Sequence, residues 1–244
     1  MKMEMIMVGL GTIIEGKNAV LSVIESGRAK SIGYLDNERL SKDIQNILNL
    51  AVQNKIELKA YSSKEEWPYH SRHSIVAICR PKKTFKEKDL DKLKKTKFIV
   101  CDHIQDTNNI GAIARSAAAF NFEAIAIPLK RSVKITERTF SIASGGLEKV
   151  DIIFYNSIFS LIKKLKSMNV WTIGLDMSGK EEVSNVDFQS HNFALFVGSE
   201  ENGLSKEVQK KLDLIVRINM ENDMESLNVS VSAAIAMHQL FIKK

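Results

Sequence analysis

The chain has 244 residues, of which 44% are hydrophobic, and it carries a formal charge of +6 at pH 7. This length allows one large domain or two ordinary ones with a substantial core, and the 3 prolines and 12 glycines are too few for a fibrous or disordered chain. No apolar run reaches the length of a signal-peptide core or a membrane span, so we expect a soluble cytoplasmic protein.

The first eighty residues predict a small α/β domain. Asn18 is placed to cap a helix that ends at Gly27, and a second helix is indicated by apolar residues on one face between Leu40 and Ala51. Short apolar runs predict strands at 31–35, 56–61 and 74–79. We therefore assign residues 1–80 to one domain.

A basic segment follows this domain. Residues 80–97 hold nine basic and three acidic side chains, so their net charge of 9 − 3 = +6 equals that of the whole chain. Such a run is either a solvated linker or a contact for a phosphate backbone. We expect a basic linker over 81–97, and RNA contacts are predicted for four of its lysines: Lys82, Lys83, Lys94 and Lys95.

The remainder, residues 98–244, alternates strand-like and helix-like runs. Strands are predicted at 97–101, 123–127, 170–176, 193–198 and 214–218, and helices at 109–120, 136–143, 157–167, 205–212 and within 225–240. Such alternation is typical of an α/β fold with a mostly parallel sheet and helices on both faces. Ligands of such sheets bind beyond the carboxyl ends of the strands, in the connecting loops.

Cysteine and histidine are too scattered for a metal centre. Cys79 and Cys101 each lie in a strand-like run, and none of the five histidines has a partner at the spacing of zinc ligands. We expect two buried, unpaired thiols and no metal.

Two of the loops carry candidate binding residues. Asn109 can cap the helix that follows, and Arg115 lies in that helix among Ala and Ile, either reaching to the surface or holding an anion. The turn from Gly198 to Gly203 has no Gly-Lys-Ser/Thr sequence and contains Glu200, so a neutral or cationic ligand suits it better than a triphosphate.

The third loop opens the last helix with more polar side chains than capping requires. Ser226, Asn228 and Ser230 precede or begin an apolar run, and a helix cap accounts for one of them. The excess indicates a pocket in which a ligand hydroxyl or ring nitrogen is hydrogen-bonded.

Three stretches in chain order, "NNIGAIARSA", "LFVGSEENGLS" and "ESLNVSVSAAIA", resemble the three motifs of the SpoU (TrmH-like) branch of the SPOUT RNA methyltransferases. They span most of the C-terminal domain. More weakly, "IIEGKNAVLSVIESG" and "HSIVAI" resemble the ribosomal-protein-like RNA-binding domain of the 23S rRNA guanosine-2′-O-methyltransferases, the nearest subgroup. The segment "ASGGLE", which ends at Glu148, also resembles this subgroup.

The resemblance implies transfer of a methyl group from S-adenosyl-L-methionine to an RNA ribose 2′-hydroxyl, a deep trefoil knot, and a homodimer with active sites at its interface. By motif position it assigns catalytic roles to Asn109, Arg115, Glu200, Ser226 and Asn228, and cofactor contacts to Gly198, Gly203, Ile218, Met220 and Leu227. The third motif usually has Pro and Gly where this sequence has Asn219 and Asn222.

Because arginine stays protonated, we expect Arg115 to hold a phosphate and stabilise the developing alkoxide rather than to accept a proton. Ser226 and Asn228 would orient the ribose or Arg115, and Glu200 would fix Arg115 or its partners. Three alternatives stay open: the same chemistry on tRNA or another rRNA site, a non-enzymatic RNA-binding or ribosome-assembly factor, and a nucleotide enzyme without an intact phosphate loop.

Overall fold

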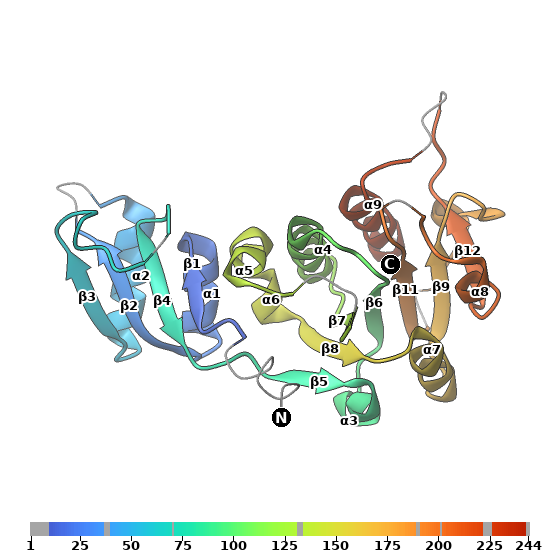
Figure 1. The fold of residues 1–244 in the computed structure, drawn as a ribbon, viewed down its shortest axis with the longest axis horizontal. Coiled ribbons are helices and arrows are strands. Elements are labelled where there is room, and N and C mark those ends of the chain that lie inside the picture. Colours follow the sequence, from blue (N-terminus) through green and yellow to red (C-terminus); the bar gives the residue numbers. More distant parts are fainter. Residues whose placement is uncertain are drawn as a thin grey trace.

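The protein was examined as a computed structural model that describes residues 10–36, 40–69, 71–130, 134–188, 191–200, 202–221 and 226–242. Two sheets with their helices lie along the long axis of the molecule, the smaller at the left of Figure 1 and the larger at the right. The α/β class expected from the sequence is thereby confirmed.

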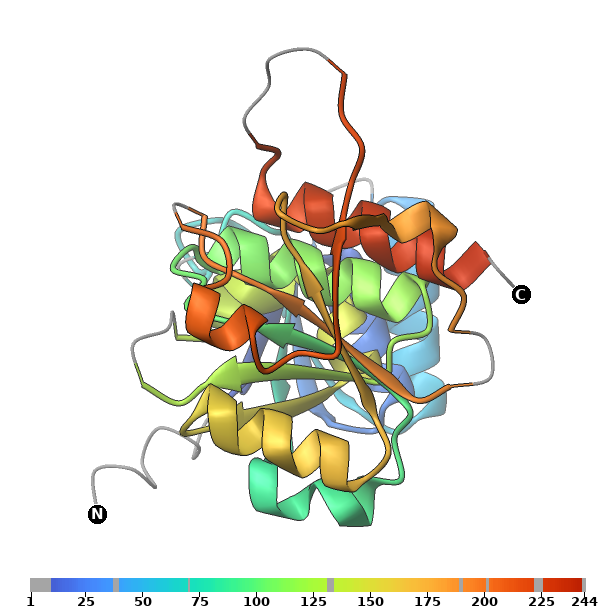
Figure 2. The same ribbon diagram turned by 90° about the vertical axis from the view of Figure 1, so that its right-hand side faces the viewer.

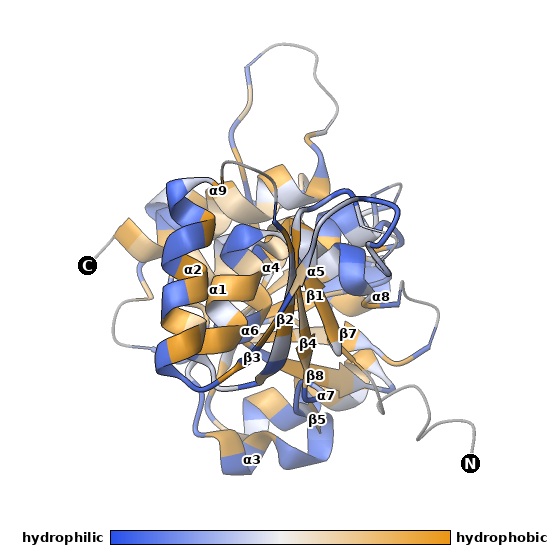
Figure 3. Ribbon diagram, turned by 90° about the vertical axis from the view of Figure 1, so that its left-hand side faces the viewer, coloured by the Kyte–Doolittle hydropathy of each residue, from blue (hydrophilic) through white to orange (hydrophobic). Residues whose placement is uncertain are grey.

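The smaller sheet has the strand order β1-β4-β2-β3, and only the β2–β3 pair is parallel. Figure 3 shows β1 and β4 as largely hydrophobic, whereas the outer side of α2 is hydrophilic. The elements are β1 (Ile13–Glu15), α1 (Lys17–Glu25), β2 (Ala29–Leu35), α2 (Lys42–Gln53), β3 (Glu57–Tyr61) and β4 (Ile75–Cys79).

The capping role expected of Asn18 is wrong. Helix α1 begins at Lys17 after Gly16, whose φ of 92° is readily adopted only by glycine. The Asn18 side chain instead donates a hydrogen bond to Ser144 in the other half of the molecule, at 2.9 Å.

The larger sheet has the order β10-β12-β9-β11-β6-β7-β8-β5, and all its recorded pairings are parallel. Its strands are β5 (Thr84–Lys86), β6 (Lys97–Cys101), β7 (Ala124–Pro128), β8 (Asp151–Tyr155), β9 (Trp171–Leu175), β10 (Glu181–Glu182), β11 (Phe193–Val197) and β12 (Leu214–Arg217). The helices between them are η1 (Glu87–Asp89), α3 (Leu90–Leu93), α4 (Thr107–Ala119), α5 (Glu137–Ala143), α6 (Gly146–Lys149), α7 (Ile158–Ser167), η2 (Val183–Asn185), α8 (Lys206–Gln209) and α9 (Val229–Ile242).

Helices cover both faces of this sheet (Figure 2). Successive strand residues point to opposite faces, so Phe98 packs in one buried cluster with α7 and α8, and Ile99 packs in another with α4 and α9. Strands buried on both faces read as continuous apolar runs, as β6, β7 and β11 do in the sequence. None of the described helices is long and apolar enough to cross a membrane.

The segment expected to be a basic linker contributes to the larger sheet. Residues 84–86 form β5, which pairs with β8, and Leu90 of α3 is fully buried. The physical reason is that Phe85 and Leu90 pack into a buried cluster on one face of this sheet, whereas Lys88 between them is exposed.

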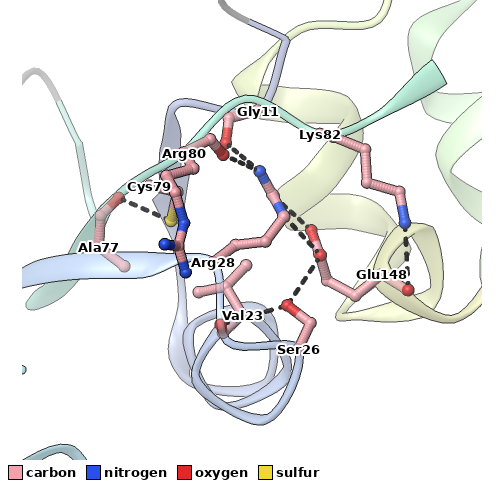
Figure 4. A network of polar contacts seen from close by, with 9 residues as sticks. All are labelled: Gly11, Val23, Ser26, Arg28, Ala77, Cys79, Arg80, Lys82 and Glu148. Atoms are coloured by element: carbon pink, nitrogen blue, oxygen red, sulfur yellow. Dashed lines mark hydrogen bonds and ion pairs between the residues drawn. The ribbon is translucent and has the colours of Figure 1, made fainter.

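A polar network joins the two halves (Figure 4). Arg28, which precedes β2, donates to both carboxylate oxygens of Glu148 on α6, at 2.8 and 2.6 Å, and also to the carbonyl oxygens of Gly11 and Arg80. Ser26 donates to the same carboxylate at 3.2 Å. The Arg28 and Glu148 side chains are 12% and 3% exposed, so this ion pair is buried.

Both cysteines are buried and unpaired, as expected. Burial raises the pKa of the Cys79 thiol to about 12 and raises that of the Cys101 thiol as well. Neither is therefore a thiolate at neutral pH.

Candidate active site

A cavity of about 410 Å³ lies at the carboxyl ends of β9, β11 and β12. Loops that follow these strands form its walls, and the first turn of α9 closes it, as expected for a parallel sheet. Its lining residues are 175–177, 197–200, 202–203, 218, 220, 226–229 and 232.

The turn after β11 brings the chain back on itself. The backbone groups of Ser199 and Gly203 exchange two hydrogen bonds, of 3.2 and 3.0 Å. A Cβ built on Gly198 would lie 2.0 Å from the Gly203 carbonyl carbon, so only glycine permits this crossing. Gly203 itself has a φ of +60°. The two glycines thus fix the shape of the turn that carries Glu200.

Asn109 connects the three loops that the sequence singled out. Its side-chain amide donates to Glu200 Oε1 at 2.8 Å, and its carbonyl oxygen accepts from Asn228 Nδ2 at 3.1 Å. Asn109 is only 6% exposed. It does not cap α4, because Asp106 accepts from the Asn108 backbone N–H and takes that position. Its amide holds the turn after β11 against the start of α9.

The third loop combines a cap with a pocket wall. Asn228 Oδ1 accepts from the backbone N–H of Ser230 at 2.9 Å and from its hydroxyl at 2.6 Å, so Asn228 is the residue that caps α9. Ser226 is exposed and lines the cavity. Asn219 is exposed just after β12, and Asn222 lies outside the described residues.

All five residues expected to contact the cofactor line the cavity: Gly198, Gly203, Ile218, Met220 and Leu227. Sequence reasoning missed Asp176, which also lines it and whose carboxylate accepts from the Ser178 backbone N–H at 3.0 Å. The available signal was an acid at the carboxyl end of a predicted strand, 170–176. Apolar walls combined with Asp176 and Glu200 suit a partly apolar, positively charged ligand.

Arg115 lies apart from this cluster. It is exposed on α4, it does not line the cavity, and its side chain makes no hydrogen bond or ion pair with any residue described. Six residues along an α-helix advance it about 9 Å from Asn109 and turn it to another face. The expected contact between Glu200 and Arg115 is therefore not made within one chain, where Glu200 accepts from Asn109 instead.

The four lysines predicted to bind RNA have different environments. Lys82 Nζ donates to the Glu148 carbonyl oxygen at 3.1 Å, and burial lowers the pKa of this lysine. Lys95 pairs with Asp151 at 3.2 Å. Lys83 and Lys94 are exposed, and Lys83 Nζ lies 5.1 Å from the centre of the Phe85 ring. Only two of the four ammonium groups thus face solvent without an ion-pair partner among the described residues.

A parallel sheet covered on both faces, with a cavity beyond the carboxyl ends of its strands, is the arrangement of open α/β proteins, which bind small ligands at that position. Residues 96–238 match the SpoU rRNA Methylase family, which is more than half of the chain, and the chain belongs to that family.

Curated relatives carry a family name of the same kind, and a solved structure shares the fold. A Bacillus subtilis protein named as a TrmH family tRNA/rRNA methyltransferase, YacO, is 26% identical over 94% of each chain. A Staphylococcus aureus protein of the same family name is 28% identical over 96% of each. The SpoU methyltransferase AviRb from Streptomyces viridochromogenes, solved with AdoMet, superposes with a TM-score of 0.77 at 18% identity, covering 99% of this chain and 97% of that one.

Proposed function

We propose that this protein transfers a methyl group from S-adenosyl-L-methionine to a ribose 2′-hydroxyl of RNA, with a guanosine of 23S rRNA as the acceptor. The observation that carries the proposal is one cavity lined by 197–200 and 202–203, by 218 and 220, and by 226–229, with Asn109 bridging the first and the last of these groups. Support for the ribose as acceptor comes from a neighbour titled RNA 2′-O ribose methyltransferase, with a TM-score of 0.75 at 17% identity.

The cavity residues fit the methyl donor. Leu175, Ile218 and Leu227 offer apolar walls for a purine ring, and Asp176 and Glu200 offer negative charge to a cationic ligand. When bound, S-adenosyl-L-methionine supplies an activated methyl group. The residues around it need only to hold donor and acceptor in line and take up the hydroxyl proton. Ser226, exposed at the mouth of the cavity, is placed to orient the acceptor.

We propose further that the chain works as a homodimer, with the knotted backbone of its family. Helix α9 is apolar around its circumference and leaves Val231 and Ile242 about half exposed, at 47% and 51%. Because α9 packs on α4, a second copy seated on this face would lie near Arg115. The unpartnered arginine could then reach the partner's cavity and hold an RNA phosphate there.

RNA would be shared between the small N-terminal domain and the exposed lysines of the basic segment. Lys83 and Lys94 are the candidates that remain for phosphate contacts, because Lys82 and Lys95 have partners within the chain.

The test is methyl transfer by the purified protein from labelled S-adenosyl-L-methionine to 23S rRNA and to tRNA, followed by mapping of 2′-O-methyl groups. We expect one guanosine of 23S rRNA to be modified. Arg115→Ala should abolish transfer while calorimetry still detects cofactor binding, because the arginine lies outside the cofactor cavity.

Other outcomes would change the proposal in defined ways. If the label is transferred to tRNA, the proposed reaction stands and tRNA replaces 23S rRNA as the proposed substrate. Absence of cofactor binding would favour a non-enzymatic RNA-binding factor. Turnover of Arg115→Ala at near the unmodified rate would remove Arg115 from the active site.

A further inference from the structure

His103, two residues after the end of β6, has an unusual backbone conformation. Among the residues that the structure describes, six non-glycine residues have a positive φ, and five of them end helices, where a left-handed residue is common. The five are Lys55, Lys94, Asn121, Ser144 and Asn169. His103, with a φ of 56°, alone follows a strand. A strained residue at the carboxyl end of a parallel strand is a candidate for function.

The imidazole of His103 is held by its neighbour Asp102. His103 Nδ1 lies 2.6 Å from Asp102 Oδ1, with Asp102 6% exposed and the His103 side chain 50% exposed. If Nδ1 donates to this carboxylate, the neutral ring has a free lone pair at Nε2. The Tyr155 hydroxyl lies 3.4 Å from the same carboxylate oxygen, and burial raises the pKa of Tyr155, which therefore stays a proton donor.

His103 faces a second cavity that adjoins the cofactor cavity. This cavity has a volume of about 780 Å³ and is lined by Asp102, His103, Gln105, Asp106, Asn109, Ser199, Glu200, Asn202, Gly203 and Ser205. Ser199, Glu200, Asn202 and Gly203 line the first cavity as well. The two cavities therefore share the turn after β11 as a common wall.

The lining chemistry leaves His103 as the suitable proton acceptor. Among the described residues that line the second cavity there is no lysine or arginine, so this lining suits a nucleoside better than a phosphate. Of its carboxylates, Asp106 caps α4, Glu200 accepts from Asn109, and Asp102 holds the imidazole. Arginine cannot accept a proton at any working pH, which excludes Arg115 from this role.

We infer that the second cavity receives the acceptor nucleoside and that His103 Nε2 takes the 2′-hydroxyl proton, with Asp102 as a positioning residue. The inference rests on the proposed function. As the new carbon–oxygen bond forms, the proton passes from the hydroxyl oxygen to Nε2, and the electron pair of the breaking carbon–sulfur bond stays on sulfur. The imidazolium then returns the proton to solvent.

The first test compares His103→Asn and His103→Gly, two residues that tolerate the left-handed backbone. Both should lower kcat by a factor of roughly 10² to 10⁴, the usual contribution of a general base, with unchanged calorimetric affinity for S-adenosyl-L-methionine. Added imidazole should restore part of the rate of His103→Gly only. The matched control is His191→Asn, an exposed histidine just before β11, at the opposite edge of the sheet, which should keep the full rate.

Two further measurements separate base catalysis from a structural role. Nitrogen-15 NMR of the cofactor-free protein should find the His103 tautomer with the proton on Nδ1. Asp102→Asn should lower kcat with an unchanged KM for RNA, because the new side-chain amide can donate to Nδ1 and so place the ring proton on Nε2. An unchanged kcat and an unchanged His103 tautomer in this variant would make Asp102 merely structural.

Different experimental results would overturn the role of His103 and the proposed methyltransferase function. If the unmodified protein methylates RNA and His103→Asn does so at the same rate, the role of His103 is overturned and the methyltransferase assignment stands. If the unmodified protein binds no S-adenosyl-L-methionine and methylates no RNA, both are overturned.

Discussion

At the scale of single residues, the sequence predicted which polar residues form the site, but it predicted the role of each residue less well. Asn109 was predicted to cap α4 and does not, whereas of the polar residues 226, 228 and 230, one of which was expected to cap α9, Asn228 is the cap. Asp106, Asn108 and Asn109 all favour capping, so the choice depends on where the chain turns into α4. The bridge from Asn109 to Glu200 joins residues 91 positions apart, which no local pattern can indicate.

Gly203 offers a prediction at this scale. Its left-handed φ disfavours a side chain, and a Cβ there would lie 2.9 Å from Asp176 Oδ2 on the wall of the cofactor cavity. Gly203→Ala should therefore cost about 1–2 kcal/mol of unfolding free energy for the backbone and should also weaken S-adenosyl-L-methionine binding by displacing Asp176. Urea denaturation and calorimetry measure the two effects.

Gly27→Ala is the matched control for Gly203→Ala. Gly27 has a similar φ of +69°, and a Cβ there would meet nothing within 4 Å. It should therefore show the backbone cost alone, with cofactor affinity unchanged. Equal affinity losses in both variants would mean that the effect is general destabilisation rather than contact with Asp176.

At the scale of elements, most long apolar runs were predicted and short polar ones were missed, although the apolar strand β8 (Asp151–Tyr155) was not predicted either. The strands β6, β7, β9 and β11 and the helices α4 and α7 fall where hydrophobicity placed them, within a few residues. Strand β5 and helix α3 were missed because their lysines dominate the local pattern, while their structure depends on pairing with β8. A three-residue strand such as β5 gains its stability from the sheet that receives it.

The basic segment gives the prediction at this scale. Lys83→Ala/Lys94→Ala should weaken RNA binding and reduce the slope of log affinity against log salt by up to about two, because each phosphate contact contributes roughly one unit. The measurement is a salt titration of affinity for a 23S rRNA fragment.

Lys163→Ala/Lys210→Ala is the control for the lysine pair. It removes two exposed lysines from α7 and from the end of α8, and so the same net charge. Its salt slope should stay close to that of the unmodified protein. Identical slopes for both double variants would leave the basic segment without a specific RNA contact.

At the scale of the whole molecule, the two halves form one packed unit. The main buried cluster contains residues from both sheets, and Arg28 pairs with Glu148 across 120 positions of sequence. The segment that ends at Glu148 was singled out by its resemblance to the rRNA subgroup, but no role could be assigned to it from the sequence. The reason is that Arg28, the partner of Glu148, lies in the other half of the molecule. Helix α6, which carries Glu148, also packs closely on α4, since a Cβ on Gly146 of α6 would lie 2.8 Å from the Cα of Arg115 on α4.

Removal of one charge tests this coupling. Glu148→Gln leaves Arg28 buried without its counter-charge, so we expect a loss of about 3 kcal/mol of unfolding free energy. The comparison is Asp43→Asn, which breaks the Lys17–Asp43 pair, whose side chains are 45% and 67% exposed. An exposed pair of this kind contributes less than about 1 kcal/mol. Urea denaturation followed by circular dichroism measures both variants.

The two tryptophans can report whether the halves unfold together. Trp67 follows β3 of the smaller sheet and Trp171 begins β9 of the larger one, so Trp67→Phe and Trp171→Phe each leave one fluorescent reporter in one half. With Glu148 intact, both reporters should give the same urea midpoint, as a two-state transition requires. In the Glu148→Gln background the midpoints should separate, because the buried pair that joins the halves is gone. Coincident midpoints there would mean that apolar packing, including Gly11 against Phe140, is sufficient to couple them.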